Sequence, residues 1–330
     1  MSSAHRTLTV LALLSFAAAF SLILSLAVGS LSLSFAEVWA ALLGHGEGLA
    51  AEVVLNLRLP RALSAFACGG LLALAGALMQ VLLRNPLADP YVLGISGGAA
   101  VGALGALWLG LGYFGMEMAA FLGALAAMWL VFGLARGDGS WTQTRLLLTG
   151  VIVAAGCGAA VALMLSLAPE HKLRGMLFWL MGDASQASEP GGVLTVLLAG
   201  LAVASFYARE LNLLARGPLL AATLGANVVR LRGVLYFLAS LLTAVAVTTV
   251  GSVGFVGLVV PHLVRLVLGN DQRLLLPAAT LAGGTLLTLA DLLARTLIAP
   301  QQLPVGVLTA LIGVPVFLFL LARAPRMELP

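Results

Sequence analysis

The residue types needed for covalent catalysis occur at Ser96 and His262. Ser96 stands in Gly94-Ile95-Ser96-Gly97-Gly98, which fits the G-x-S-x-G pattern of serine nucleophiles. Such a nucleophile needs a base within hydrogen-bond reach and oxyanion donors beside it, so His262 would have to lie next to Ser96 on a neighbouring helix. Because small residues recur every four positions through Gly98 and Gly102, we interpret this stretch as a packing face. An intramembrane serine protease is a remote alternative.

Ion coupling is a second chemistry to consider. Ion-coupled secondary transporters carry ionisable side chains within their membrane segments. Asp291 lies near the middle of an apolar segment, and Arg295 follows one helical turn later, where the two side chains can pair. A single carboxylate beside an arginine is a weak basis for proton or sodium coupling, so a secondary transporter is the alternative and not the preferred class.

The chain lacks the residues that an ATPase requires. A P-loop needs Lys followed by Ser or Thr, but the single lysine, Lys172, is followed by Leu173. If ATP drives this protein, a separate partner must bind ATP and magnesium, and we expect no cofactor in this chain. Cys68 and Cys157 lie within apolar segments, where a thiol behaves as a small hydrophobe, so no metal site is predicted.

Apolar segments must position all of these side chains. The chain has 330 residues, of which 61% are hydrophobic and 9% charged, whereas soluble domains have about 25% charged residues. Runs of roughly 20 apolar residues recur along the chain, each long enough to cross a bilayer as a helix. We predict an all-α polytopic membrane protein forming one domain over residues 1–330. Helices are expected at about 8–28, 62–83, 91–110, 117–135, 146–167, 191–208, 233–250, 254–269, 274–294 and 305–322.

The basic residues predict the orientation of these ten segments. An even number of crossings places both termini on one side, and twelve of the 17 Lys and Arg residues fall on that side, which the positive-inside rule makes cytoplasmic. The twelve are Arg6, Arg84, Arg136, Arg145, Arg209, Arg216, Arg230, Arg232, Arg265, Arg273, Arg323 and Arg326. The five exceptions are Arg58, Arg61, Lys172, Arg174 and Arg295. Because the basic residues are dispersed between apolar runs, no nucleic-acid surface is expected.

Three motif stretches carry more information than hydropathy. They are Arg84–Pro90 with Tyr91–Gly98, then Ala208–Gly217 with Leu224-Gly225, and finally Gly254–His262 with several later polar positions up to Gly313. Together, and in this order, they resemble the permease family that carries iron–siderophore complexes, haem or cobalamin through the bacterial inner membrane. The resemblance covers nearly the whole chain.

The resemblance implies an assembly. It implies a type II ABC importer permease fold of about ten helices, paired with a second copy as a homodimer, with the substrate path between the two copies. Two ABC ATPase subunits would bind the cytoplasmic side, and a periplasmic substrate-binding protein would dock on the other. These motifs do not identify the particular chelate that is carried.

The resemblance also implies roles for residues near the ends of the spans. Arg58, Arg61 and Arg295 are the expected contacts for the binding protein, because guanidinium groups pair bidentately with carboxylates on a partner. ATPase coupling falls on the loop 209–232, at Arg209, Glu210, Leu211, Asn212, Arg216, Gly217, Leu224 and Gly225, in short helices at the membrane surface.

Two further groups are expected to face the substrate. The cytoplasmic gate falls on Asn85, Leu87, Gln143 and Thr144, where Gln143 departs from the small hydroxyl residue expected. The periplasmic entrance falls on His171, Lys172 and Arg174, within a loop at 168–190 that contains a short helix. For these three basic residues, a helix cap with an interfacial aromatic anchor is an equally good interpretation.

Overall fold

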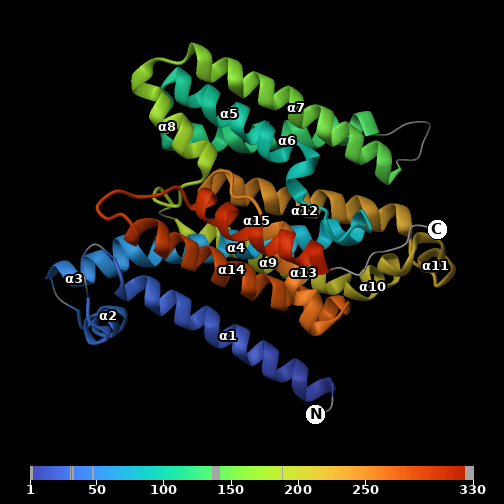
Figure 1. The fold of residues 1–330 in the computed structure, drawn as a ribbon, viewed down its shortest axis with the longest axis horizontal. Coiled ribbons are helices and arrows are strands. Elements are labelled where there is room, and N and C mark those ends of the chain that lie inside the picture. Colours follow the sequence, from blue (N-terminus) through green and yellow to red (C-terminus); the bar gives the residue numbers. More distant parts are fainter. Residues whose placement is uncertain are drawn as a thin grey trace.

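The computed structural model describes residues 3–29, 31, 33–46, 48–135, 142–187 and 189–323, and this part of the chain contains helices but no strands (Figure 1). Two of the twelve arginines on the predicted cytoplasmic side, Arg136 and Arg326, lie outside the described residues. The long helices are α1 (Ser3–Ala27), α4 (Leu59–Leu82), α5 (Ile95–Leu109), α6 (Tyr113–Ala135), α7 (Gln143–Leu167), α9 (Pro190–Phe206), α12 (Val228–Val250), α13 (Val256–Leu268), α14 (Gln272–Thr296) and α15 (Val305–Arg323). The shorter elements are α2 (Phe35–Leu42), α3 (Gly48–Glu52), a π-helical stretch (Val53–Arg58), a 3₁₀-helix (Pro90–Leu93), α8 (Glu170–Met181), α10 (Ala208–Arg216) and α11 (Pro218–Thr223).

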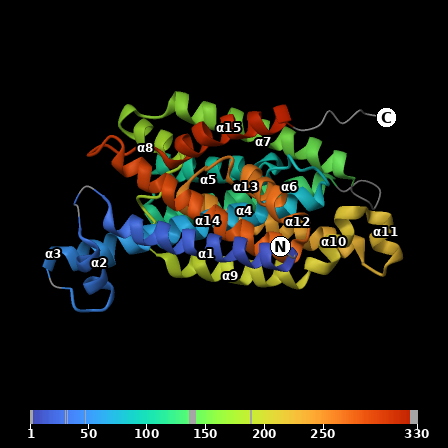
Figure 2. The same cartoon turned by 60° about the horizontal axis from the view of Figure 1, so that its bottom comes forward.

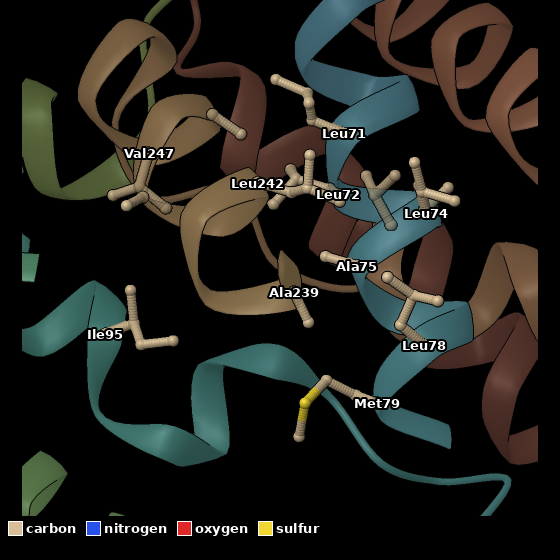
Figure 3. Close-up of a cluster of buried hydrophobic side chains, with 14 of the residues drawn as sticks. Leu71, Leu72, Leu74, Ala75, Leu78, Met79, Ile95, Ala239, Leu242 and Val247 are labelled. Carbon is tan, nitrogen blue, oxygen red and sulfur yellow. The ribbon is translucent and has the colours of Figure 1, made fainter. Parts of the chain in front are cut away.

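Helix α4 is the centre of the bundle. It packs against α14, α12, α13 and α9, and nearly all of its side chains are buried. Figure 3 shows its Leu72 next to Leu242 of α12, and both side chains are fully buried. Small residues allow this closeness, because a Cβ on Gly76 would overlap the carbonyl oxygen of Gly257 in α13.

The glycine face predicted around Ser96 packs α5 against α6. A Cβ on Gly98 would overlap the carbonyl oxygen of Gly123, and one on Gly102 would overlap that of Ala119. Gly94 has a different role, because it precedes the first residue of α5 with a φ of 76°, a conformation that side chains disfavour. The packing interpretation of this stretch therefore holds for its middle and not for its start.

Each of the ten predicted segments contains a helix, but they differ in length. Within the described residues, six helical stretches are long and apolar enough to cross a membrane, or seven if α9 and α10, which are bent by 60° at Tyr207, form one span. The other three predicted segments contain the shorter apolar helices α5, α13 and α15. With 13 residues, α13 extends about 20 Å, less than a hydrocarbon core of about 30 Å. The fold is therefore a multi-pass helical bundle, in which α13 is too short to cross a bilayer as a helix alone.

Three helical elements precede α4 in a segment where the sequence pattern predicted none. They are α2, α3 and the π-helical stretch, between residues 29 and 61. A local signal was present, because the Ser34 hydroxyl caps the Glu37 backbone N–H while the Glu37 carboxylate accepts from the Ser34 backbone N–H. This reciprocal capping box marks the start of a helix from sequence.

Candidate functional site

The polar residues of interest gather at opposite ends of the bundle. Figures 1 and 2 both show α2 and α3 at one end and α10 and α11 at the other. We call these the α2 end and the α10 end. The sequence-predicted docking residues lie at the α2 end and the coupling residues at the α10 end, so the fold separates the two groups by the length of the bundle.

At the α2 end, Arg58 is buried and holds the end of α1. Only 5% of its surface is exposed. Its Nη1 donates to the carbonyl oxygens of Leu26 at 2.6 Å and Ala27 at 2.9 Å, and its Nη2 donates to that of Leu31. These carbonyls have no helical partner, and a guanidinium can satisfy several at once. The Arg58 side chain thus joins the π-helical stretch to the last turn of α1.

Arg61 and Arg295 meet at a buried carboxylate. Arg61 Nη2 lies 2.7 Å from Asp291 Oδ1 and its Nε lies 3.0 Å from Oδ2, a bidentate pair in which Asp291 is 1% exposed. Arg295 Nε lies 3.9 Å from Asp291 Oδ2, and its Nη2 donates to the backbone oxygen and hydroxyl of Ser25. The sequence suggested Arg295 as the partner of Asp291, but Arg61 makes the closer pair.

These arginines line a hollow of about 420 Å³, which we call the α2 hollow. Its lining includes Arg58, Arg61, Arg295, Ser185 and Gln302, and the described residues that line it include no acid. Arg61 Nη1 donates to Gln302 Oε1 at 3.2 Å. Three positive charges on one wall, with Asp291 beneath, leave the hollow suited to an acidic group.

The predicted entrance residues lie on α8, and two of them have partners within the chain. Lys172 Nζ donates to the carbonyl oxygen of Trp108 at 2.7 Å, near the end of α5. The Arg174 guanidinium carbon lies 5.7 Å from the centre of the Phe178 ring. His171 is exposed. These contacts match the cap and aromatic-anchor interpretation of the basic residues.

At the α10 end, Asn212 ties α10 to the start of α14. Its Nδ2 donates to Asp271 Oδ1 at 2.8 Å, and its Oδ1 accepts from the backbone N–H of Gln272 at 2.9 Å. Leu211 is fully buried beneath, whereas Arg209 and Arg216 are exposed and Glu210 is half-buried. Helix α10 is therefore amphipathic, fixed on one face and charged on the other.

Helix α11 presents an apolar surface that nothing in the described chain covers. Leu219 is 80% exposed and Leu224 is 59% exposed. Gly217, with a φ of 132°, separates α10 from α11, and Gly225, with a φ of 87°, follows α11. Both glycines have conformations that side chains rarely adopt. The result is a rigid elbow, α10–Gly217–α11, whose apolar side faces away from the bundle.

The predicted gate residues lie in two segments that touch. Asn85 Oδ1 accepts from the Leu87 backbone N–H at 2.9 Å, which closes a tight turn after α4. Gln143 Nε2 donates to the carbonyl oxygen of Leu82 at 2.9 Å, joining the start of α7 to the end of α4. Thr144 is exposed beside it. Gln143, unexpected from sequence, is the side chain that bridges the segments.

Asp89, in the same loop, gives a prediction about pH. Burial raises the pKa of Asp89 from 3.8 to about 6, against the opposite effect of the Tyr91 backbone N–H that it accepts. The raised pKa means that the fold favours the protonated acid, so this contribution to stability is present below pH 4 and lost as pH rises through 6.

Asp89→Asn keeps the acceptor oxygen without the charge. We expect the variant to be more stable than the wild type by about 1 kcal/mol at pH 8, and not at pH 4, in thermal unfolding of the purified protein. An equal difference at both pH values would contradict this.

The structure gives Ser96 no catalytic base. Its hydroxyl lies 3.2 Å from that of Ser252, in the non-helical segment between α12 and α13. His262 Nδ1 is buried with no hydrogen-bond partner among the described residues. A serine nucleophile without an adjacent base is not activated.

Sequence reasoning missed some residues of these sites. Gln302 lies in a loop after α14 and lines the α2 hollow, and no local sequence pattern marks it as a site residue. Gln272 was passed over, although it follows Asp271 in a motif stretch and lies at the start of α14. Both become visible only when distant segments are brought together.

Comparison with known proteins places this arrangement in a family. Residues 17–323 match the FecCD transport family. The hemin transport system permease protein of Yersinia pestis is 41% identical over 304 residues, covering 90% of each chain. The Fe(3+) dicitrate transport system permease protein of Escherichia coli is 40% identical over 301 residues, covering 89% of this chain and 90% of its own. A cobalamin import system permease protein of Halobacterium salinarum is 42% identical over 287 residues, covering 86% and 77%.

A solved structure agrees with these relatives. The inward-facing conformation of a metal-chelate type ABC transporter superposes with a TM-score of 0.83 at 31% identity, covering 96% of this chain and 99% of that one. Neither a protease nor an ion-coupled carrier is among these relatives, and the family consists of transport permeases and not enzymes. The chain is a multi-pass membrane protein and belongs to the FecCD transport family.

Proposed function

We propose that this chain is the membrane-spanning subunit of an ATP-driven ABC importer that moves an iron chelate, such as a siderophore complex or haem, or cobalamin, from periplasm to cytoplasm. The names of the relatives support this substrate class, since they include hemin, Fe(3+) dicitrate and cobalamin. The chain carries no ATP site in this proposal. Two ATPase subunits bind ATP and magnesium, a substrate-binding protein delivers the cargo, and a second copy of this chain completes the pore.

The proposed topology has ten crossings of the bacterial inner membrane, with both termini in the cytoplasm. The charge distribution supports this orientation, because it assigns the α10 end, with Arg209, Arg216 and Arg265, to the cytoplasm. The first and last described helices, α1 and α15, also begin and end toward the α10 end (Figure 1). The α2 end is then periplasmic, and one domain spans residues 1–330.

The observation that carries this proposal is the difference between the two ends of one bundle. The α2 end has a hollow lined by three arginines and no acid among its described residues, which suits a charged docking partner. The α10 end has a fixed elbow with exposed leucines, which suits a partner that must move with it. A transporter driven by a separate motor needs both kinds of surface, on opposite sides of the membrane.

We infer that the α2 hollow receives an acidic side chain of the binding protein. Arg61 and Arg295 supply the charge, and Arg58 supports them while it holds the end of α1. Arg295 lines the α2 hollow together with Arg61, so both charges lie next to the space that an acidic side chain would enter. Because all three arginines also hold the fold, their replacement would confuse docking with stability.

Gln302→Glu tests docking without disturbing those arginines. The new carboxylate keeps the acceptor for Arg61 Nη1 and adds negative charge to the α2 hollow. Because charges at an interface rim contribute about 1 kcal/mol, we expect binding-protein affinity to fall about fivefold at low salt, and less at high salt. The matched control is Gln301→Glu, on an exposed neighbour outside the lining. Equal affinities for both variants and the wild type, measured by titration in nanodiscs, would remove the α2 hollow from docking.

The remaining expected sites follow from this assignment. The loop 209–232 would couple to the ATPase through Arg209, Arg216 and the α11 leucines, while Leu211 and Asn212 fix the elbow on the bundle. Asn85, Leu87, Gln143 and Thr144 would close the cytoplasmic exit. For His171, Lys172 and Arg174 at the periplasmic entrance, the internal partners of Lys172 and Arg174 favour a supporting role over direct substrate contact.

Uptake by the complete importer tests the proposed function. The permease, its ATPase and its binding protein are reconstituted in proteoliposomes, with the binding protein outside and ATP inside. Uptake of labelled haem, ferric siderophore or cobalamin is expected for one class, and only with both ATP and binding protein present. Uptake driven by a proton or sodium gradient without ATP would overturn the proposal.

A further inference from the structure

A second hollow, of about 670 Å³, lies at the α10 end, between the end of α4, α10, the end of α13 and the start of α14. We call it the α10 hollow. Its polar lining consists of Gln80, Arg84, Asn212, Arg216, Arg265, Asn270, Asp271 and Gln272. These residues come from four regions of the sequence, which the bundle brings to one place.

The charge in the α10 hollow is not balanced by the chain itself. Within the residues that the structure describes, Arg84, Arg216 and Arg265 make no salt bridge. The one acid of the lining, Asp271, is occupied, because its Oδ1 accepts from Asn212 Nδ2 at 2.8 Å and from the Arg273 backbone N–H at 3.1 Å. Three guanidinium groups beside a single carboxylate leave a net positive charge in the lining, which suits an anion.

Two buried glutamines add an independent observation. Gln80 and Gln272 are 3% and 1% exposed, and the side-chain oxygen of each is buried without a hydrogen-bond donor among the described residues. Their amide nitrogens are engaged, with Leu258 O at 3.1 Å and Asn270 O at 3.3 Å, so flipping either amide would only exchange one unsatisfied atom for another. Buried acceptors of this kind need a partner. The lining of the α10 hollow therefore combines three guanidinium groups with two glutamines whose side-chain oxygens have no partner among the described residues.

Helix dipoles give a simpler explanation for part of this set. Arg216 and Arg265 stand in the last turns of α10 and α13, where a positive charge stabilises the helix. This accounts for one arginine at each helix end. It does not account for the two glutamine oxygens or for the convergence of three guanidinium groups on one hollow.

We propose that the α10 hollow is a socket for an acidic side chain of the ATPase subunit. The inference rests on the proposed function, which gives this chain an ATPase partner, and adds a recessed site in which the permease receives a residue of the motor. The position supports this occupant, since Asn212 and Arg216 belong both to the socket and to the elbow. The carboxylate would bridge Arg265 and Arg216, and so connect α13 to α10.

Retention of the ATPase tests the socket. The complete importer is purified through a tag on this chain, in neutral-lipid nanodiscs, and ATPase affinity is measured over a series of KCl concentrations without transport substrate. Arg265→Gln is expected to weaken ATPase binding about 30-fold, and Arg265→Lys less than about threefold, because it keeps the charge. The matched control is Arg273→Gln, on an exposed arginine of the same surface outside the lining. An equal loss for Arg265→Gln and Arg273→Gln would show general charge attraction and overturn the socket.

A charge exchange identifies the partner. In the Arg265→Glu importer, each acidic residue of the ATPase is changed in turn to arginine, and one exchange is expected to restore binding at least tenfold over the single variant. Failure of every exchange would overturn the proposal. So would Arg265-dependent binding of inorganic phosphate, ATP or anionic phospholipid by the permease without its ATPase, combined with unchanged ATPase retention. Absence of ATPase from the purified wild type would instead contradict the proposed function.

Discussion

Asp291→Asn is expected to destabilise the protein by about 3 kcal/mol or more, the largest effect on stability that we predict. The carboxylate of Asp291 is 1% exposed and pairs with Arg61 and Arg295, which are 14% and 10% exposed. Removing its charge leaves two largely buried guanidinium groups without their carboxylate partner. Desolvated charges are destabilising when their partner is lost, which is why breaking a buried pair costs more than the pair itself contributes. Chemical unfolding of the purified protein in detergent measures the change.

A double variant tests whether the destabilisation comes from the broken ion pair or from the loss of a polar group in general. Arg61→Gln together with Asp291→Asn should recover about 1 kcal/mol or more relative to the sum of the single changes, because one unpaired charge is then removed. Asp183→Asn is the control, since among the described residues the Asp183 carboxylate accepts hydrogen bonds only from Ser185, its neighbour two positions along the chain. It should change stability by less than about 1 kcal/mol. Wild-type stability in Asp291→Asn would show that the pair contributes little.

Leu219→Asp is expected to abolish ATP-driven uptake, lowering it about 30-fold or more, while leaving the fold intact. Leu219 is 80% exposed on α11, so a charge there meets water and should change stability by less than about 0.5 kcal/mol. If the elbow packs into the ATPase, the same charge is buried at the centre of an interface, where truncation of anchor residues costs about 2 kcal/mol or more. Binding-protein-stimulated ATP hydrolysis and uptake are measured on the same preparation.

The control for Leu219→Asp is Leu109→Asp. Leu109 is 79% exposed, but it ends α5, far from α10 and α11 (Figure 1). The Leu109 variant should keep ATPase stimulation within about twofold of the wild type, since exposed substitutions away from an interface act weakly. Full stimulation in Leu219→Asp would place the ATPase contact elsewhere on the α10 end.

The sequence by itself determined the class of this protein. Ten apolar segments had to be helices, since unpaired backbone is not tolerated in lipid, and each of them contains a helix in the structure. Ordered motifs such as Arg84–Pro90 and Gly254–His262 pointed to the family that residues 17–323 match. The glycine face of α5 was also readable, because its four-residue spacing is a local property of one helix.

Only the tertiary structure decided what the charged residues contact. Periodicity suggested Arg295 as the partner of Asp291, but Arg61, 230 residues away, makes the closer pair. Likewise, the resemblance to the family implied that Arg58 is a docking residue, whereas the fold buries its side chain against the end of α1. Local sequence fixes which helix a side chain is on, whereas ion pairs, hollows and unsatisfied oxygens arise between helices that are distant in sequence. The α2 hollow and the α10 hollow, where our docking and socket proposals lie, are of this second kind.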